Sequence, residues 1–268
     1  MFPVNAQPFE RTIGIMTKFW EAGRVKTRLA QSMLDYPDRL ARWTHGHDGR
    51  PAEARQDAAA RARLLALSAR LHERFVVQLL DELQDCGDER QLVGTPPPTF
   101  NTMRAIAGPN WQVVDQGPGN LGDRMKRWFA AKSDIEGNKA ASVLIGSDCP
   151  LLSRSDLDGT WDLLSEHDIV LGPAIDGGYY LIGIAGCPRP EKLSMVFDDI
   201  AWSTSTVLEQ TIEAIEKLGW SLAMLPPRRD VDCAEDLAAL LDSFPHRRSE
   251  SLDRFYADLI RLLNSVPT

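Results

Sequence analysis

The chain has 268 residues, of which 43% are hydrophobic and 25% are charged. This is ordinary globular composition, and a chain of this size can bury a substantial core without disulfides or structural metals. The formal net charge of -8 argues against a surface for nucleic acid or for an acidic membrane, although a local basic cluster can still hold an anionic small molecule.

The cysteines and the first residues indicate a reducing compartment. Four cysteines lie far apart without a CxxC spacing, which disfavours a disulfide framework or a structural zinc site. The opening MFPVNAQPFER is polar, and no apolar run approaches the length of a membrane span. We therefore expect a cytoplasmic protein with no membrane span.

Seven short apolar segments predict strands. Several are apolar at consecutive positions, which is typical of strands buried on both faces. The predicted strands are residues 11–17, 91–95, 111–115, 141–145, 168–172, 178–184 and 221–225.

Helical patterns separate these strands. After the first strand the chain enters a helical stretch, and further helices are expected at residues 54–84, 121–132, 155–166, 205–218 and 234–241. The alternation predicts an α/β fold with a Rossmann-like, largely parallel sheet flanked by helices. We expect one domain over residues 1–268, with a polar insertion at about 36–51 and a C-terminal helical extension at about 244–268 that contains RFYADLIRLL.

A basic loop follows the first strand. Residues 18–30 read KFWEAGRVKTRLA, with the cations Lys18, Arg24, Lys26 and Arg28 and with Gly23, which lets a ligand approach the backbone. In α/β sheets the carboxyl edge is where ligands bind, so the loop suits phosphates. A solvated basic turn is the alternative, because the loop lacks the Walker and GxGxxG patterns.

Three acidic residues stand at turns. Asp148 ends an apolar strand in the sequence VLIGSDCP, where a carboxylate suits Mg²⁺ or Mn²⁺; the alternative is that Asp148 or Ser153 caps the next helix. Asp176 begins an Asp-Gly-Gly turn that can be a ligand site or an ordinary hairpin. Asp232 is a second metal-ligand candidate, with a helix N-cap as its alternative.

Other candidates are weaker. The lone histidines His72 and His167 have no partners in view, and no Ser/His/Asp arrangement stands out. Residues 197–204 precede a helix and suit an N-cap segment, or a segment that closes over a substrate.

Together these motifs resemble the DUF2064 family. The strings GRVKTRLA, GSDCPLL, GPAIDGGYYLIGI, FDDIAWSTSTVL and DVDCAEDL carry the resemblance, in order, over residues 12–241. That family is labelled as glycosyltransferases associated with radical-SAM and selenium-related domains, and it falls in the nucleotide-diphospho-sugar transferase superfamily. The resemblance therefore implies the GT-A fold.

The resemblance also implies roles for individual residues. Asp148 and Asp232 would ligate the divalent metal, and Asp176 would lie near the acceptor. If the donor is a nucleotide-sugar, Asp176 is the candidate base for an acceptor hydroxyl, so Asp148 and Asp176 are the expected catalytic residues. The nucleotide would be bound by Lys18, Gly23, Arg24, Lys26, Arg28, Gln116, Gly119, Leu121, Gly122 and Arg124. The acceptor would contact Gly177, Gly178, Tyr179 and Trp202. One departure is that Asn120 stands where the family's GDLG segment has an acid.

The functional hypothesis is a metal-dependent transferase that uses a nucleotide-activated donor and a small-molecule acceptor. A glycosyltransferase that uses a nucleotide-sugar is the first interpretation. The alternatives are guanylyl or cytidylyl transfer from an NTP to a phosphorylated small molecule, which the dense cations favour, and a degenerate nucleotide-binding module.

Overall fold

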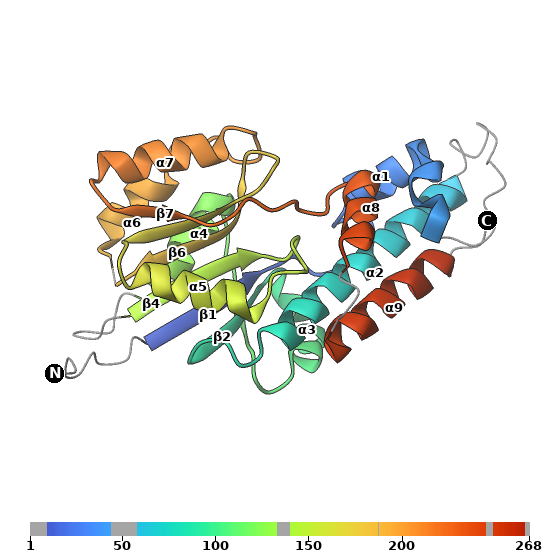
Figure 1. Ribbon diagram of the computed structural model, residues 1–268, viewed down its shortest axis with the longest axis horizontal. Helices are drawn as coiled ribbons and strands as arrows, with labels where there is room; N and C mark the ends of the chain where they lie inside the picture. Colours follow the sequence, from blue (N-terminus) through green and yellow to red (C-terminus); the bar gives the residue numbers. More distant parts are fainter. Residues whose placement is uncertain (1–9, 44–57, 133–139, 187, 245–248, 266–268) are drawn as a thin grey trace. The chain divides into compact units, whose positions relative to one another are not determined.

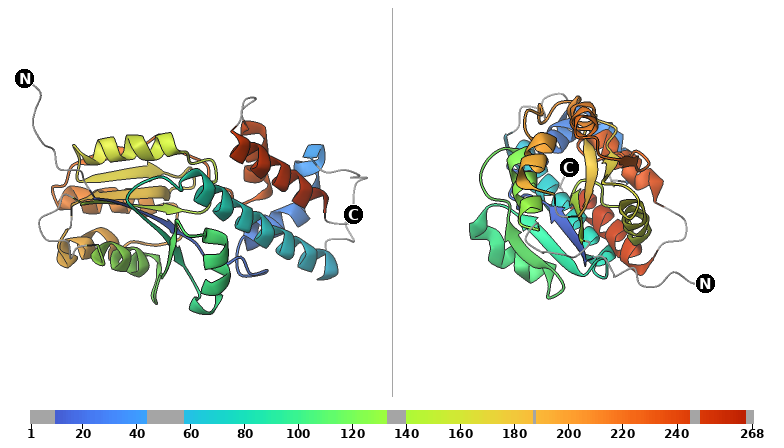
Figure 2. Two further views of the ribbon diagram at one scale, coloured as in Figure 1. Left: turned by 90° about the horizontal axis from the view of Figure 1, so that it is seen from below. Right: turned by 90° about the vertical axis from the view of Figure 1, so that its left-hand side faces the viewer.

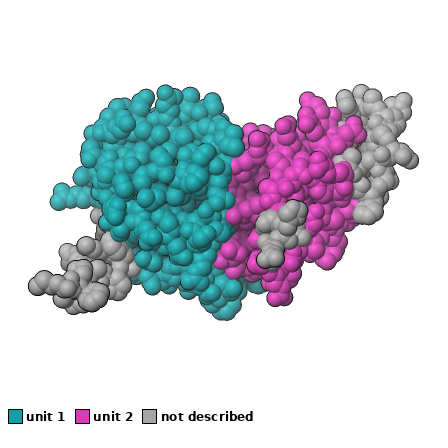
Figure 3. All heavy atoms as spheres, in the orientation of Figure 1, with its two compact units in different colours: residues 1–17, 83–146, 152–228 teal, residues 18–82, 147–151, 229–268 magenta. Residues whose placement is uncertain are grey.

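The computed structural model describes residues 10–43, 58–132, 140–186, 188–244 and 249–265. They form two compact units, each assembled from several stretches of chain (Figure 3). Unit 1 comprises residues 1–17, 83–146 and 152–228, and unit 2 comprises residues 18–82, 147–151 and 229–268. The expectation of one domain stays a prediction. The expected insertion lies partly outside the described residues, and its described part includes the 3₁₀ helix η1 (Pro37–Trp43).

Unit 1 contains a seven-stranded sheet in the order β3-β2-β1-β4-β6-β5-β7 (Figure 1). β6 runs antiparallel to both neighbours, whereas the other pairs are parallel. The strands are β1 (Glu10–Met16), β2 (Glu89–Gly94), β3 (Gln112–Asp115), β4 (Ala140–Gly146), β5 (Ile169–Pro173), β6 (Tyr179–Ala185) and β7 (Leu222–Met224). All seven predicted strands are present, and the predicted mixed, mostly parallel α/β fold is confirmed.

Helices cover both faces of this sheet (Figure 2). Side chains of α4 (Leu121–Ala130), α6 (Pro190–Phe197) and α7 (Val207–Lys217) share a core with inward residues of β4, β5 and β6. α5 (Arg154–Leu164) packs on the opposite face, where Leu164 lies against Gly183. β4 is buried along its whole apolar length, as expected for a strand between two helical layers.

Two short helices of unit 1 are absent from the sequence prediction. α3 (Phe100–Ala107) and α6 have eight residues each, too few to display a clear helical period. Pro190 at the first position of α6 fits a helix start, because the missing proline N–H has no intrahelical partner there.

Unit 2 is helical in the part of the chain that the structure describes. Its core joins apolar side chains of α1 (Thr27–Asp35), α2 (Ala58–Glu82), α8 (Ala234–Ser243) and α9 (Glu250–Asn264). The largest fully buried side chain is Phe75 of α2, which lies edge-on to Phe255 of α9. Within the expected C-terminal extension, α9 is an amphipathic helix whose apolar side chains belong to this core. Among the described helices, none is both long and apolar enough to cross a membrane.

Asp168 connects the start of β5 to the edge strand β7. Its carboxylate accepts hydrogen bonds from the backbone N–H of Ser221 (2.8 Å) and from the Ser221 hydroxyl (2.7 Å). These hydrogen bonds hold the pKa of Asp168 below its ordinary value. A carboxyl group whose pKa is lowered by folding stabilises the folded state at pH values above its unfolded pKa of about 3.9. This stabilisation is lost as the pH falls through the folded pKa.

Asp168→Asn is therefore expected to flatten the acid dependence of stability. Urea unfolding between about pH 5 and pH 2 should show a smaller loss of unfolding free energy than in the wild type, by less than about 1 kcal/mol because Asp168 is exposed. Asp162→Asn, at an exposed position of α5, is the control. An unchanged acid slope in Asp168→Asn would contradict the role of the Ser221 hydrogen bonds.

Candidate functional site

The site begins at two neighbouring strand ends. β1 and β4 are parallel, with Met16 opposite Gly146, so both strands end at the same edge of the sheet. The next residues, 18–26 and 147–151, belong to unit 2. The predicted basic loop and Asp148 therefore fall in the same compact unit as Asp232.

Lys26 is the central residue of unit 2's polar cluster. It occupies the N-cap position of α1 with a left-handed backbone (φ 48°), and its side chain is only 5% exposed. The ammonium nitrogen lies 2.8 Å from Asp148 Oδ1 and 2.9 Å from Asp232 Oδ1. It also donates to the backbone carbonyl of Val231 at 2.6 Å. Two acids that lie 84 positions apart in the sequence thus meet at one nitrogen.

Asp232 is held from a second side by Arg28. The guanidinium Nη2 contacts Asp232 Oδ2, while most of the Arg28 side chain is exposed (78%). Asp148 is partly exposed, but its Oδ1 is buried and accepts no well-formed hydrogen bond from the described residues despite its close approach to Lys26. A buried carboxylate oxygen in that state is well suited to a cation.

Helix capping does not account for these two acids. The N-cap of α5 is Ser153, which forms a capping box with Asp156. The N-cap of α8 is Cys233, and the carboxylate of Asp236 accepts from its backbone N–H. Both helix starts are therefore capped by other residues, and the carboxylates of Asp148 and Asp232 face Lys26.

Hydrogen bonds hold the segment that carries Asp148 and the segment that carries Asp232 together. The N–H of Val231 donates to the carbonyl of Asp148 at 3.0 Å, and the thiol of Cys149 lies 3.6 Å from the carbonyl of Arg229. The N–H of Ala234 donates to the hydroxyl of Ser32 in α1. α1, the 147–151 segment and the start of α8 are thereby held in one arrangement.

The charges of the cluster stabilise one another. Burial alone would raise the pKa of Asp148, but the attraction of the Lys26 ammonium outweighs burial, and the pKa lies below the ordinary value. Burial would likewise lower the pKa of Lys26, yet Asp148 and Asp232 raise it above its ordinary value. At neutral pH the Asp148 carboxylate and the Lys26 ammonium are therefore both charged.

His72 is a member of this cluster that the sequence analysis did not identify. It lies on the buried side of α2, with Nδ1 3.8 Å from Asp148 Oδ1 and Nε2 3.2 Å from the carbonyl oxygen of Lys18. Burial lowers the pKa of His72, so the ring is neutral at neutral pH. The available signal was a polar residue within the apolar stripe of a long helix.

The other predicted residues of the basic loop are exposed. Lys18 and Arg24 lie at the surface, and Gly23 has a positive φ of 78°. Gly23 also lines a cavity of about 120 Å³ with α1 and α2 residues that include Arg61. Two of the four predicted phosphate-binding cations, Lys26 and Arg28, are therefore engaged by acids, and Lys18 and Arg24 face outward.

The second group of predicted nucleotide residues lies in unit 1, after β3. Gln116 is buried and donates to the carbonyls of Thr17 (2.7 Å) and Val93 (2.9 Å). Arg124 donates to the Gln116 side-chain oxygen and to the carbonyl of Gly119. These bonds hold the turn before α4 against the ends of β1 and β2. Asn120 caps α4 in a capping box with Asp123, which gives this departure from the family pattern a structural role.

An aromatic pair lies beside the start of α4. Trp202 and Tyr179 form an edge-on contact with ring centroids 6.5 Å apart. A Cβ on Gly122 would lie 2.5 Å from the Trp202 indole nitrogen, so only glycine allows this approach. Burial raises the pKa of the Tyr179 phenol, which is therefore neutral. The predicted nucleotide residue Gly122 thus lies against the predicted acceptor residue Trp202, and Leu121 next to it is exposed.

The Asp-Gly-Gly turn connects β5 to β6 as a hairpin. Asp176 is exposed, and its Oδ1 accepts from the N–H of Gly178 at 2.9 Å. Gly177 has a φ of 92°, and its carbonyl accepts from Leu208 at the start of α7. Asp176 therefore stabilises the turn through this hydrogen bond, and its catalytic role stays a prediction.

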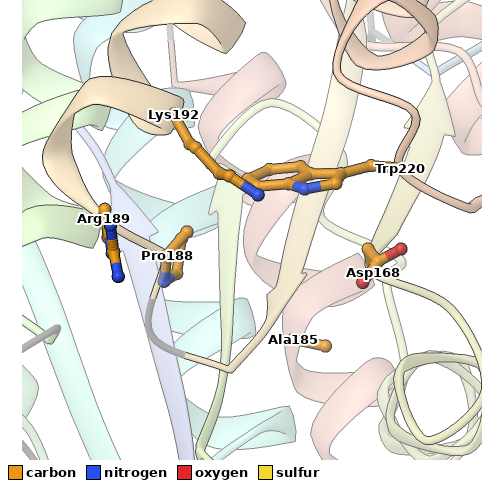
Figure 4. Close-up of a pocket in the computed structure, with 6 residues that line it drawn as sticks. All are labelled: Asp168, Ala185, Pro188, Arg189, Lys192 and Trp220. Carbon is orange, nitrogen blue, oxygen red and sulfur yellow. The ribbon is translucent and has the colours of Figure 1, made fainter.

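Unit 1 has a separate hollow at the amino-terminal end of β5, which is the end of the sheet opposite to the carboxyl ends of β1 and β4. Its volume is about 460 Å³, and Lys192 extends across the ring of Trp220 at 5.5 Å from the centroid (Figure 4). Its lining residues are Asp168, Ala185, Pro188, Arg189, Lys192 and Trp220. None of the site residues predicted from the sequence lines this hollow.

Comparison with known proteins agrees with this fold and with the sequence resemblance. Residues 79–204 match the family model described as "Uncharacterized protein conserved in bacteria (DUF2064)". A Desulfovibrio desulfuricans structure, described as a "putative nucleotide-diphospho-sugar transferase", is 28% identical with a TM-score of 0.71 and covers 96% of this chain and 99% of that one. The resemblance to DUF2064 and the predicted fold are thus confirmed.

More distant structures are also similar. Rv0371c of Mycobacterium tuberculosis, in complex with manganese, is 16% identical with a TM-score of 0.44 and covers 88% of this chain and 100% of that one. The 4-diphosphocytidyl-2C-methyl-D-erythritol synthase of Anaerococcus prevotii is 11% identical with a TM-score of 0.48, over 87% and 96% of the chains. No curated protein matches the chain.

Proposed function

From the DUF2064 segment at residues 79–204 and the nucleotide-diphospho-sugar transferase fold, we propose that this protein is a metal-dependent transferase with a nucleotide-activated donor. The first candidate donor is a nucleotide-sugar and the acceptor is a small molecule. The observation that carries the proposal is the convergence of Asp148 and Asp232, from two distant motifs, on the ammonium of Lys26.

The donor atoms of this cluster fit Mg²⁺ or Mn²⁺. Carboxylate oxygens are the ligands that such hard cations prefer, and Asp148 Oδ1 is buried with no well-formed hydrogen bond from the described residues. Asp148 and Asp232 would hold the ion. A bound ion would neutralise charge on the phosphate oxygens of the donor.

The chain's own residues have complementary tasks in this proposal. In unit 2, Lys18 and Arg24 are the candidates to hold the donor's phosphates, and Lys26 joins them when it leaves the acids. In unit 1, the turn from Gln116 to Arg124 is the candidate for the nucleoside. The acceptor lies at Gly177, Gly178, Tyr179 and Trp202. Its hydroxyl gives a proton to the Asp176 carboxylate as it bonds to the anomeric carbon, and the nucleoside diphosphate leaves.

The charges of the cluster favour a nucleotide-sugar over an NTP as the donor. A triphosphate needs more cationic partners than the diphosphate of a nucleotide-sugar. Arg28 is engaged by Asp232, and Lys26 contacts both acids before a donor binds, so fewer of the loop's cations meet phosphate at once than the sequence alone indicates. Nucleotidyl transfer is therefore the second candidate.

The test is a ligand screen followed by product analysis. UDP-, GDP- and CDP-sugars and the NTPs are added with and without Mn²⁺ or Mg²⁺ while thermal unfolding is followed. A ligand at a hundredfold excess over its dissociation constant should add roughly 2.7 kcal/mol to the stability.

The product then identifies the reaction. Metal-dependent release of a nucleoside diphosphate from one nucleotide-sugar is the expected result, whereas pyrophosphate release from an NTP would favour nucleotidyl transfer. If no nucleotide stabilises the protein in the presence of metal, the transferase proposal is wrong.

A further inference from the structure

Lys26 lies in a cage of three oxygen atoms. Its nitrogen is 2.6 Å from the Val231 carbonyl, 2.8 Å from Asp148 Oδ1 and 2.9 Å from Asp232 Oδ1. An ammonium group has three N–H donors; Val231 and Asp232 accept hydrogen bonds from it, and Asp148 forms an ion pair with it. Two carboxylates and one carbonyl are also the kind of oxygen set that binds a hard divalent cation.

We propose that Lys26 is an internal counter-ion that occupies the metal cage in the nucleotide-free protein, and that a divalent cation enters only when the ammonium leaves. The inference also assigns the Val231 carbonyl as a third cage oxygen. It rests on the proposed function, since it concerns the metal of that same site.

The charges of the cage explain why one cation or the other must be present. Two carboxylates that lie this close repel each other, and Asp148 Oδ1 is buried. With Lys26 in place this repulsion is balanced, and the side chain is only 5% exposed. A divalent ion on the same oxygens would lie very near the ammonium and be repelled by it.

The side chain of Lys26 can leave the cage while its backbone stays. The residue is fixed at the N-cap of α1, where its carbonyl accepts from Ala30 at 3.1 Å, but the four-carbon stem is flexible. Donor phosphates would give the ammonium new anionic partners. Metal and nucleotide binding are therefore expected to strengthen each other.

Arg28 provides the matched control. It also pairs with Asp232, but through Oδ2, and its side chain is 78% exposed. Its charge is therefore screened by solvent and lies outside the three-oxygen cage. Removing Arg28 takes away one positive charge, as removing Lys26 does, without emptying the cage.

The experiment measures Mn²⁺ binding without nucleotide, by calorimetry and by electron paramagnetic resonance. Lys26→Met is expected to bind Mn²⁺ at least about tenfold more tightly than the wild type. Arg28→Met should differ from the wild type by less than about threefold. Mn²⁺ should also raise the melting temperature of Lys26→Met more than that of the wild type, because it restores the missing positive charge.

A second measurement covers the case in which Lys26→Met does not fold. Wild-type Mn²⁺ affinity is measured with and without a nucleoside diphosphate, and the nucleotide should increase it by about tenfold or more. Equal affinity in both conditions would overturn the inference.

The outcomes separate this inference from the proposed function. If the wild type binds Mn²⁺ without nucleotide as tightly as Lys26→Met, and Asp148→Asn abolishes that binding, the metal site stands and the counter-ion role is wrong. If no variant binds Mn²⁺ with or without nucleotide, the proposed metal dependence is wrong and the inference falls with it.

Discussion

Asp148→Asn is expected to lower kcat/KM of the proposed transfer by about 10³-fold, which corresponds to roughly 4 kcal/mol of transition-state stabilisation. Asparagine keeps the size of the side chain but removes the charge of a metal ligand. The fold should persist, because Lys26 keeps its contacts with Asp232 and the Val231 carbonyl. Steady-state kinetics on the donor found in the screen, together with circular dichroism, tests both statements.

The control for this variant is Asp158→Asn. Asp158 is an exposed carboxylate of α5 that pairs with Arg154 at 3.8 Å, and it belongs to none of the predicted sites. Its loss should leave kcat/KM within about twofold of the wild type, since exposed ion pairs contribute little. If Asp148→Asn retains a tenth or more of the wild-type activity, Asp148 is not a metal ligand in the reaction.

The strands were predictable because a strand that is buried on both faces is apolar at consecutive positions, which is visible in the sequence. β4 reads AASVLIG, and its short length and β-branched Val143 and Ile145 favour a buried strand over a buried helix. α3 and α6 show no clear helical periodicity in the sequence, because an eight-residue helix has only about two turns. The antiparallel placement of β6 was predictable from the short Asp-Gly-Gly turn, which is too short for a parallel crossover.

The site was predictable only in part. Strand ends and family motifs indicated that Asp148 and Asp232 matter, but no pattern in the sequence shows that both acids meet Lys26. Spacing cannot supply this, because the three residues come from separate segments that only the packing of unit 2 brings together. His72 was missed for the same reason, since its partners lie on other elements.

The alternatives of helix capping show where sequence reasoning is inherently ambiguous. An acid before a helix has the same appearance whether it caps that helix or binds a ligand. The structure separates the two at α8, where Asp236 accepts from the N–H of Cys233 while Asp232 points to Lys26. Only the position of the carboxylate relative to the helix N–H groups makes this distinction.

Gly177→Ala is expected to destabilise unit 1 by about 2–4 kcal/mol, the range typical of strained or overpacked backbone positions. Gly177 has a φ of 92°, which L side chains rarely adopt, and a Cβ there would lie 2.1 Å from the Ser205 carbonyl oxygen. Backbone atoms must shift to relieve that contact, so the turn and the 197–206 segment move together. Urea unfolding followed by tryptophan fluorescence measures the loss.

Gly178→Ala, one residue along the chain, is the matched control. A Cβ on Gly178 would meet only the Asp176 carboxylate at 3.3 Å, and the N–H that donates to Asp176 remains. A loss below about 1 kcal/mol is expected there. If both variants unfold at the same urea concentration as the wild type, the close contact between the turn and Ser205 does not exist in solution. If only Gly177→Ala is destabilised, the contact exists, and Gly177 is required in the turn whether or not the acceptor binds beside it.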